Sequence, residues 1–378
     1  MACNANDWCL HHGLFIQTHV NHQRHSLLYF AASPPPYEQV DTVPSVIFYG
    51  TDRLREDPAF SFSARWKRNP VLQFAWRPWE KYLIKRVGVG FRLDQAVRHL
   101  LSLRRQDIVL AETDSTGLPL LLLKRLGLIK GRVGFISAGL INILELQQKT
   151  RLFVWYRWLL RAADFIICWS PIEEQTYRQL VGAKAHFVRL EADVDYYKPD
   201  PSAVLEPYVL CVGRDVGRDF QTLFEALEDL NVPAKVVTSP VRVRGLRVPK
   251  NVELILRFVD YPALLDLYRR ARLVVVSLQE IHRFTGQRAL LESLAMGKAT
   301  IVARTMAVVG TYTLKDIQDV VFYEPGDADD LVQKIRTVYN YERQIRALGV
   351  NGRRFVETLP KGAFYSGVRE ILVKIVEQ

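Results

Sequence analysis

The chain has little of several features that define specialised classes of protein. Its 378 residues contain only four cysteines, too few for a disulfide framework in a chain of this length. No uncharged apolar run approaches the roughly 18 residues that cross a bilayer. The first residues, MACNANDWCLHH, lack the basic and then apolar pattern of a secretory signal. We therefore expect a globular protein of a reducing, cytoplasmic environment.

Histidine and cysteine are concentrated in the first 25 residues. This segment holds five of the eight histidines and two of the four cysteines: Cys3, Cys9, His11, His12, His19, His22 and His25. Their spacing matches no zinc pattern, so we interpret the segment as a polar leader before the first strand, with a metal site as the alternative. Cys168 and Cys211 stand inside apolar runs instead, where a thiol packs as a small hydrophobe.

Positive charge is concentrated in residues 65–132. This segment carries fifteen Lys or Arg against five Asp or Glu, so it accounts for nearly all of the net charge of +11. It also contains Trp66, Trp76 and Trp79, and basic side chains interleaved with tryptophan suit an anionic membrane surface. Nucleic acid would suit them too, and a solvated basic face over core tryptophans is the third interpretation. We expect a membrane and no nucleic acid.

Part of this basic segment has helical periodicity. Trp76, Trp79 and Leu83 recur at spacings of three and four, which predicts that they share one helical face. Lys81 and Lys85 would then lie on another face. Such a helix would rest on the inner membrane leaflet and reach a lipid-linked acceptor, while packing of the same apolar face against the domain core is the alternative.

Short apolar runs alternate with helical patterns almost throughout. The first half has candidate strands at 26–32, 45–50, 71–76, 107–112, 132–137 and 164–169, and candidate helices at 94–105, 117–126, 142–163 and 171–181. The second half has candidate strands at 208–213, 234–239, 252–256, 272–278, 299–303 and 319–323, and helices from about Phe220, Pro262, Gly286 and Asp327. This alternation predicts parallel sheets that helices cover on both faces.

The alternation breaks at residues 196–207, which carry three prolines and no periodicity. We interpret them as the linker between two doubly wound, Rossmann-like α/β domains that face each other across a cleft. The predicted domains are an acceptor-side domain over 1–200 and a nucleotide-sugar-binding domain over 201–358. A C-terminal helix over 359–378 is a candidate to cross back to the first domain.

The stretch 272–303 carries the clearest binding signal. A buried strand ends near Leu278, and Thr285-Gly286 then opens a helix, with Thr285 as the expected N-cap. Gly286 lets a ligand approach the backbone, and the free amides and positive dipole end of the helix suit a diphosphate. Glu292 lies near the same end, where a carboxylate can accept both hydroxyls of a ribose. A glutamate that merely faces solvent is the alternative.

Five motifs of the sequence resemble motifs of the retaining GT-B glycosyltransferases, in particular the large bacterial family 4-like group, and follow one another as they do in that family. The stretch TGQRALLESLAMGKATIV is similar to the family's Gly-rich loop and its leucine-rich helix with a glutamate. The other four motifs are ADFIICWSPIEEQTYRQLVG, EADVDYYKPD, YVLCVGRDVGRDFQTLFEAL and VVFYEPGDADDLVQKI. The resemblance spans about residues 105–340 and implies a GT-B fold and a UDP-, GDP- or ADP-sugar as donor.

The resemblance also implies the donor-site residues. Arg214 and Arg218 match the two basic positions that hold the nucleotide's phosphates, where guanidinium forks donate bidentately. A surface network of Arg214 with Asp215 or Asp219 is the alternative. The other implied positions are Thr285, Gly286 and Gln287 in the loop over the sugar and phosphates, Glu292 at the ribose, and Phe258 and Val259 beside the base.

The sequence departs from the family's pattern at the reaction centre. Relatives place a first glutamate eight positions before the ribose glutamate, and Phe284 stands there in this chain. Glu280 and His282 are therefore only candidates for a catalytic role. Relatives often carry a histidine on the acceptor side, where this chain has Ser137 and Gly139.

A second departure lies in the acceptor-side loop at Ser33, which has lost the family's glycines. The family is metal-independent, so we expect neither a metal nor another cofactor.

We expect a hexosyltransferase-like glycosyltransferase that transfers a sugar with retention to a glycan or lipid-linked acceptor. It would act in surface polysaccharide or glycolipid assembly, in the cytoplasm and peripherally on the inner membrane face. A non-catalytic GT-B subunit that binds glycan or nucleotide for a partner enzyme is the alternative, which Phe284 motivates. A sugar-nucleotide epimerase would not be expected to show this linker and helix combination.

Overall fold

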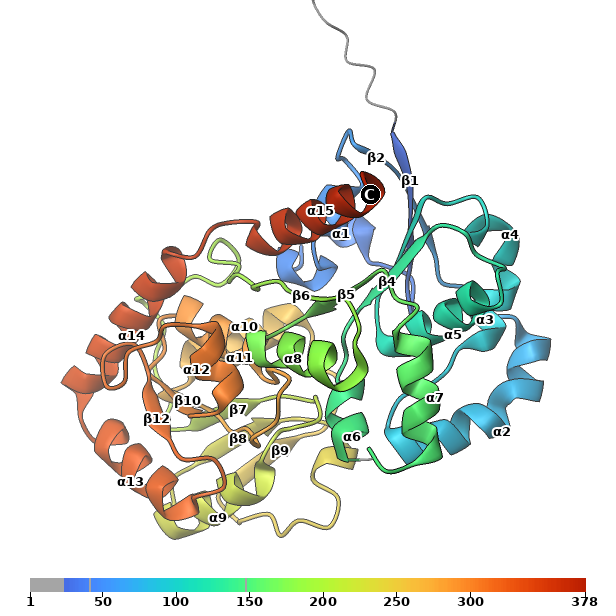
Figure 1. Ribbon diagram of the computed structural model, residues 1–378. Coiled ribbons are helices and arrows are strands. Elements are labelled where there is room, and N and C mark those ends of the chain that lie inside the picture. Colours follow the sequence, from blue (N-terminus) through green and yellow to red (C-terminus); the bar gives the residue numbers. More distant parts are fainter. Residues whose placement is uncertain (1–23, 41, 147) are drawn as a thin grey trace, which may run out of the picture.

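The computed structural model describes residues 24–40, 42–146 and 148–378, which form an N-terminal and a C-terminal α/β half (Figure 1). The N-terminal half contains a six-stranded parallel sheet with the order β2-β1-β3-β4-β5-β6. Its strands are β1 (His25–Phe30), β2 (Phe60–Arg65), β3 (Ile108–Ala111), β4 (Arg132–Ile136), β5 (Phe165–Cys168) and β6 (Ala185–Phe187). The strand order reverses between β1 and β3, which are hydrogen-bonded neighbours.

The C-terminal half repeats this plan with the order β12-β11-β10-β7-β8-β9. Its strands are β7 (Val209–Val212), β8 (Ala234–Val237), β9 (Val252–Ile255), β10 (Leu273–Val276), β11 (Thr300–Ala303) and β12 (Val321–Tyr323). The chain runs outward from β7 through β9 and returns beside β7 as β10. In open α/β sheets, ligands bind outside the carboxyl ends of the strands at such a reversal.

Helices connect the strands and cover the sheets. In the N-terminal half they are α1 (Thr51–Leu54), α2 (Pro70–Val87), α3 (Leu93–Arg98), α4 (Leu100–Leu103), α5 (Asp114–Arg125), α6 (Leu140–Leu146), α7 (Arg151–Leu160) and α8 (Pro171–Thr176), with the short turns η1 (Tyr37–Gln39), η2 (Ser45–Phe48) and η3 (Tyr177–Val181). In the C-terminal half they are α9 (Phe220–Leu230), η4 (Pro240–Arg242), α10 (Tyr261–Arg270), α11 (Gln287–Ala295), α12 (Met306–Thr311), α13 (Ala328–Tyr339), α14 (Glu342–Glu357) and α15 (Ala363–Val376).

The central strands of the sheets are apolar on both faces because helices cover both. All four residues of β10 are fully buried, as are those of β11. Continuous Val, Ile and Leu runs of this kind are typical of parallel strands in a covered sheet. Two α/β halves with parallel sheets confirm the predicted fold class.

Two predicted strands of the N-terminal half are wrong. Residues 45–50 form the 3₁₀ turn η2 and its left-handed exit, and residues 71–76 lie inside α2. Both runs are apolar, but Asn69 caps α2 through Val71 and Leu72 N–H, and Pro70 occupies its first turn, where a missing N–H costs nothing. The sheet instead contains β2 and β6, which the sequence did not predict. Both are edge strands, and polar residues alternate through β2.

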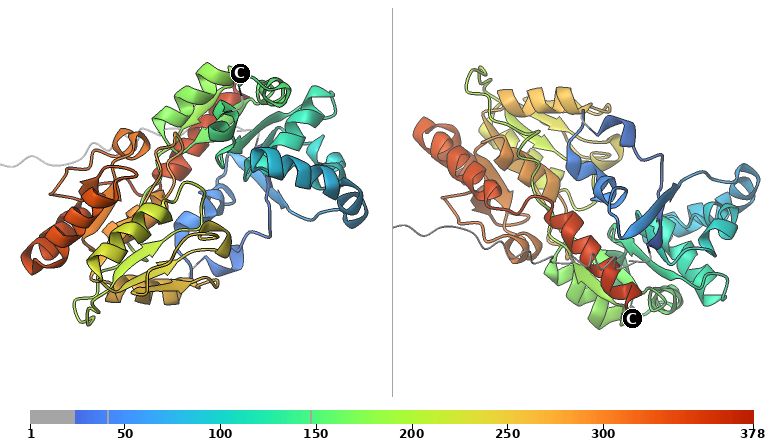
Figure 2. Two further views of the ribbon diagram at one scale, coloured as in Figure 1. Left: turned by 90° about the horizontal axis from the view of Figure 1, so that it is seen from below. Right: turned by 90° about the horizontal axis from the view of Figure 1, so that it is seen from above.

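The C-terminal helix α15 leaves the C-terminal half and contacts α1 of the N-terminal half (Figures 1 and 2). Asp57 accepts hydrogen bonds from Tyr365 Oη at 2.7 Å and Arg369 Nε at 2.6 Å. At the start of α15, Phe364 stacks on Trp169 with 5.4 Å between the ring centroids. Because Trp169 follows β5, the C-terminal helix supports the loops at the carboxyl end of the N-terminal sheet.

Helix α2 lies at the outer edge of the N-terminal half (Figure 1). The predicted single apolar face is wrong in one residue. Trp76 and Leu83 face the core, where Trp76 Nε1 donates to Phe91 O at 2.6 Å, whereas Trp79 is 62% exposed. Within the described ranges, neither α2 nor any other helix is long and apolar enough to span a membrane.

Candidate functional site

The carboxyl ends of β7 and β10 form one wall of a cleft of about 350 Å³. Tyr49 and Trp169 of the N-terminal half and Leu190 of the connecting segment also line it. The cleft therefore lies between the two halves at the strand-order reversal of the C-terminal sheet, which is where the fold favours a ligand.

The turn after β7 is fitted closely to the loop after β10. Gln279 N–H donates to Gly217 O at 2.8 Å, and Ser277 Oγ donates to Asp219 O at 2.5 Å. The Arg218 guanidinium lies against Gly213, where an added Cβ would approach its carbon to 2.2 Å. Glycine is required there because any side chain would displace Arg218 from the cleft.

Asp215 joins the two loops through its side chain. Its Oδ1 accepts from Arg218 Nε at 2.8 Å, and its Oδ2 accepts from Gly286 N–H, also at 2.8 Å. Burial acts to raise the pKa of this carboxyl, but the charge and hydrogen bond of Arg218 outweigh it and hold the pKa below its ordinary value. The carboxyl is thus an anion in the neutral range.

The N-terminus of α11 begins at Gly286, not at Thr285. Gly286 has a left-handed φ of +70° and is the N-cap, so the predicted N-cap at Thr285 is wrong. The Thr285 hydroxyl points instead toward Gly217 O at 3.5 Å. The Gly286 N–H, which a capping-box side chain within the helix would otherwise bind, donates instead to Asp215 of a different strand-to-helix turn.

Glu292 lies one turn and a half along α11 and lines the cleft, with 5% of its surface exposed. Tyr268 Oη donates to its Oε2 at 3.1 Å, and Arg288 lies 3.5 Å from its Oε1. Gln287 also lines the cleft, and its Nε2 donates to Tyr312 Oη at 2.8 Å. Its Oε1 is buried without a partner among the described residues, which leaves an acceptor for a ligand donor.

An exposed aromatic ring forms the rim of the cleft. Phe258 is 74% exposed, and the Arg214 guanidinium lies 6.0 Å from its ring centroid. Val259 lines the cleft beside it. Asp215 pairs with Arg218 and not with Arg214, so the structure does not show the alternative surface network for Arg214. An aromatic ring with a cation beside it offers a flat surface for a nucleobase.

The sequence reading missed two arginines of the cleft, Arg283 and Arg288. Arg283 lies on the loop after β10 and packs on Gly139, where an added Cβ would lie 3.4 Å from its Cδ. Its N–H donates to Asn142 Oδ1 at 3.3 Å, so the loop contacts the N-terminal half. The signal was present in the motif, since both arginines flank Gly286 and Gln287.

The N-terminal side carries a buried acidic network. Ser137 Oγ donates to Glu173 Oε1 at 2.6 Å, and Asp114 Oδ2 accepts from Ala138 N–H at 2.8 Å. Burial raises the pKa of Asp114 to about 7 and raises the pKa of Glu173 as well. The charge of Arg283 lowers both, so an arginine of the C-terminal half partly stabilises these carboxyl groups. Ser137 is itself buried inside this network, away from the cleft surface.

Several other predicted residues lie elsewhere. Glu280 accepts from Met306 N–H at 3.1 Å, at the start of α12, and His282 Nδ1 lies 3.0 Å from Glu145 and 3.1 Å from Thr176. Neither is among the described residues that line the cleft. Ser33 is exposed at the end of the N-terminal sheet. The catalytic candidates Glu280 and His282 thus hold a helix end and an interface between the halves.

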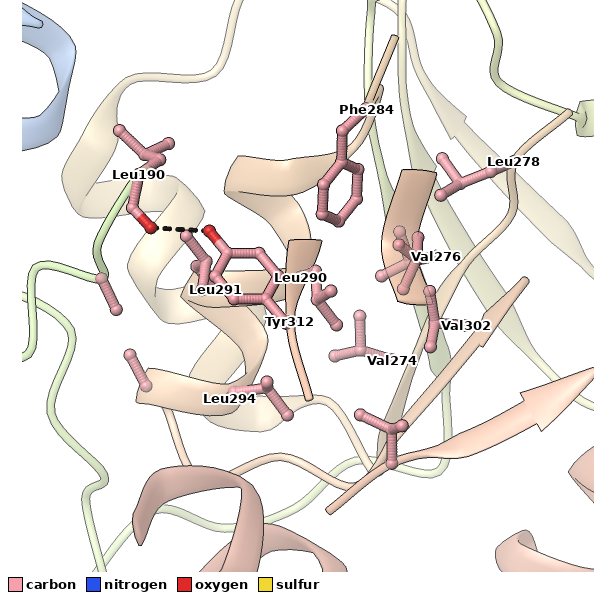
Figure 3. Close-up of a cluster of buried hydrophobic side chains, with 14 of the residues drawn as sticks. Leu190, Val274, Val276, Leu278, Phe284, Leu290, Leu291, Leu294, Val302 and Tyr312 are labelled. Atoms are coloured by element: carbon pink, nitrogen blue, oxygen red, sulfur yellow. Dashed lines mark hydrogen bonds between the residues drawn. The ribbon is translucent and has the colours of Figure 1, made fainter. Parts of the chain in front are cut away.

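Phe284 takes a place in the hydrophobic core. It is 3% exposed, and its ring meets Tyr312 edge to face at a centroid distance of 5.8 Å (Figure 3). Tyr312 Oη donates to Leu190 O at 2.6 Å, which ties this core to the segment between the halves. A carboxylate at position 284 would be costly in this apolar setting, so the departure from the family's glutamate suits the local packing.

A metal site is not evident in the described ranges, where no three His, Cys, Asp or Glu side chains gather as ligands. The Cys and His cluster of the first 25 residues lies outside the described residues, apart from His25 in β1. The chemistry that the site itself offers is cationic. Arg214, Arg218, Arg283 and Arg288 line the same cleft as the N-terminus of α11.

The sequence matches no family model and no curated protein. Solved GT-B glycosyltransferases share its fold over almost the whole chain. Sucrose-phosphate synthase (tll1590) from Thermosynechococcus elongatus aligns with a TM-score of 0.68 and 14% identity, over 94% of this chain and 100% of that chain. The Anabaena protein Alr3699/HepE in complex with UDP-glucose aligns with a TM-score of 0.64 and 13% identity, over 94% and 100%.

Trehalose-6-phosphate synthase from E. coli, bound with UDP-2-fluoro glucose, aligns with a TM-score of 0.63 and 9% identity, over 93% of this chain and 99% of that chain. Identities this low show the fold alone. The chain has the GT-B fold.

Proposed function

We propose that this protein is a glycosyltransferase that uses a nucleoside-diphosphate sugar. The observation that carries the proposal is the group of four arginines that line the same cleft as the N-terminus of α11, between two GT-B halves. A helix N-terminus with guanidinium groups beside it is suited to a diphosphate. Glu292 supplies a carboxylate for the ribose, and Phe258 supplies a ring for the base. The solved structures HepE and trehalose-6-phosphate synthase contain UDP or UDP-sugars, which makes UDP the first nucleotide to test.

The proposed chemistry needs no nucleophilic side chain. As the bond between the sugar and the diphosphate breaks, negative charge develops on the leaving group, and Arg214, Arg218 and the α11 amides would stabilise it. Arg283 and Arg288 add positive charge on the same side. This arrangement supports our expectation of metal-independent transfer. Retention of configuration and a hexose as the transferred sugar follow from the family resemblance and belong to the proposal.

The acceptor would enter from the N-terminal half, and we place this half at an anionic membrane. Along α2, Phe74 is 81% exposed and Trp79 is 62% exposed, and Lys81 and Lys85 are exposed as well. Interleaved aromatic and basic side chains suit the interface of an anionic bilayer. A lipid-linked glycan on the inner leaflet is therefore the proposed acceptor, in polysaccharide or glycolipid assembly.

A non-catalytic nucleotide-binding subunit is the second candidate function. The observation that favours it is Phe284, which packs in the core where relatives of the resembled family carry a glutamate for the donor sugar. Such a subunit would bind the nucleotide through the same arginines, but it would not release the sugar.

A ligand screen followed by a hydrolysis assay tests these functions. Thermal unfolding is measured with UDP, GDP and ADP and then with their sugar conjugates, since a ligand at 100 times its dissociation constant adds about 2.7 kcal/mol of stability. We expect one nucleotide to stabilise the chain, and its sugar conjugate to be hydrolysed slowly without an acceptor. Binding without any hydrolysis or transfer would favour the non-catalytic subunit. Absence of binding to every nucleotide would contradict both functions.

A further inference from the structure

The anion site at the N-terminus of α11 already holds a negatively charged group. Asp215 accepts Gly286 N–H through Oδ2 and Arg218 Nε through Oδ1, each at 2.8 Å. These are the first amide of the helix and a guanidinium that a diphosphate at this place would use. A side-chain carboxylate is thus seated where the proposed function requires a phosphate.

Arg218 is incompletely satisfied by this carboxylate. The residue is 8% exposed, and its Nη1 is buried without a hydrogen-bond partner among the described residues. Its guanidinium carbon would lie 3.2 Å from a Cβ at Gly286, so the group sits directly at the helix end. This guanidinium N–H lies at the helix end and leaves a donor free for an incoming anion.

The Asp215 side chain can move out of the anion site while the backbone of its loop keeps its conformation. Its side chain is 28% exposed and lines the cleft, so the carboxylate has solvent beside it. The surrounding backbone is held by other contacts, namely Gln279 N–H to Gly217 O and Ser277 Oγ to Asp219 O. Rotation of the Asp215 side chain would therefore free the amide and the guanidinium while the loop keeps its shape.

We propose that Asp215 is an internal competitor for the diphosphate, which occupies the anion site in the empty protein and is displaced on binding. The inference rests on the proposed function, because that function supplies the diphosphate. Displacement favours a ligand that engages several cations at once, since a diphosphate reaches more of the four arginines than a single phosphate does. Asp215 thus weakens binding of all anions and selects for diphosphates.

Calorimetric titration with inorganic pyrophosphate and with UDP tests this role. The variants are Asp215→Asn, which keeps the shape of the side chain and removes its charge, and Asp215→Ser, which removes the carboxylate and leaves a small polar side chain. Asp229→Asn is the matched control, because it removes one exposed carboxylate of the same half outside the cleft. Thermal unfolding without ligand checks that each variant folds.

We expect pyrophosphate to bind Asp215→Asn and Asp215→Ser roughly tenfold more tightly than the parent, equivalent to about 1.4 kcal/mol. The Asp229→Asn control should stay within about twofold of the parent. Equal or weaker pyrophosphate binding by both Asp215 variants would overturn the inference, and would show that the carboxylate braces Arg218. Tighter pyrophosphate binding with no binding of UDP, GDP or ADP would support the inference and contradict the proposed function.

Discussion

Arginines line the C-terminal wall of the cleft, whereas the N-terminal wall presents the aromatic rings of Tyr49 and Trp169. The carboxyl groups of the N-terminal half, Asp114 and Glu173, are fully buried near that wall. Both walls are built at the carboxyl ends of parallel strands, so the fold alone does not cause the difference. The arginines of the C-terminal wall line the cleft that a ligand would enter, whereas the carboxyl groups near the N-terminal wall are buried.

The difference shows how the same fold supports two kinds of polar site. Two of the arginines have carboxylate partners, since Asp215 pairs with Arg218 and Glu292 with Arg288. Asp114 has little solvent and no partner for its Oδ1 among the described residues, and burial raises its pKa to about 7. Burial therefore raises the pKa of a carboxyl group until it binds a proton near neutral pH, while the guanidinium groups that line the cleft remain available for an anion.

The largest effect that we expect comes from neutralising the enclosed carboxyl with Asp114→Asn. A folded-state pKa raised from 3.8 to about 7 means that the folded chain holds a proton which the unfolded chain has lost, so stability falls as the pH rises through this window. Asp114→Asn should flatten this fall. Its free energy of unfolding, relative to that of the parent, should be higher at pH 8 than at pH 4 by on the order of 2–4 kcal/mol.

Urea unfolding at pH 4 and pH 8 measures this difference between the parent and Asp114→Asn. Glu173→Gln should act in the same direction, since burial raises the pKa of Glu173 too. Parallel pH profiles for the parent and Asp114→Asn would show that this carboxyl does not titrate in the window.

The next largest effect tests the open wall. Arg218→Ala removes a buried guanidinium from the anion site and should weaken nucleoside-diphosphate binding roughly 100-fold, about 2.7 kcal/mol. Titration calorimetry with the nucleotide selected by the screen measures it. Arg247→Ala is the control, because Arg247 is 83% exposed and pairs with Glu228 outside the cleft. Unchanged affinity in Arg218→Ala would place the diphosphate elsewhere.

A smaller effect is expected at the rim. Phe258→Ala should weaken nucleotide binding roughly tenfold, about 1.4 kcal/mol, because a stacking surface for the base is lost. Pyrophosphate has no base, so its affinity should not change. Phe258→Tyr keeps the ring and should bind like the parent. If Phe258→Ala bound the nucleotide as tightly as the parent, the base would lie away from this ring.

The smallest effects concern the outer face of α2. Co-sedimentation at low salt should show binding to anionic vesicles and none to neutral vesicles. The variant Lys85→Gln should reduce it severalfold, since one basic side chain near an anionic surface contributes about 1 kcal/mol. Trp79→Ser should act in the same direction. Val350→Ser is the control, an exposed apolar residue of α14. Equal recovery with both kinds of vesicle would contradict membrane docking.

The two halves also differed in how well the sequence predicted them. All six strands of the C-terminal sheet were expected at their places, because each is a mainly apolar run, and those of β10, β11 and β12 are entirely buried. In the N-terminal half, the apolar run at 71–76 lies on a helix whose outer face is exposed, and hydrophobicity alone does not distinguish this from a strand. The sequence did not predict the edge strand β2, because its polar residues interrupt the apolar pattern.

The sequence predicted residues of the candidate site better than the contacts between them. Local motifs carried Arg214, Arg218, Gly286, Gln287 and Glu292, all of which line the cleft. The pairing of Asp215 with Gly286 joins residues 71 positions apart, and no local pattern indicates it.

By itself, the sequence determined most of the alternation of strands and helices and the helix that begins at Gly286, because these depend on local periodicity and backbone freedom. The tertiary structure alone decided which charges are open and which are enclosed. It buried Phe284 in the core, placed Asp215 on the end of α11 and sealed Asp114 within the N-terminal half. Burial and long-range contacts set these outcomes, since the free energy of a charge depends on what surrounds it in space.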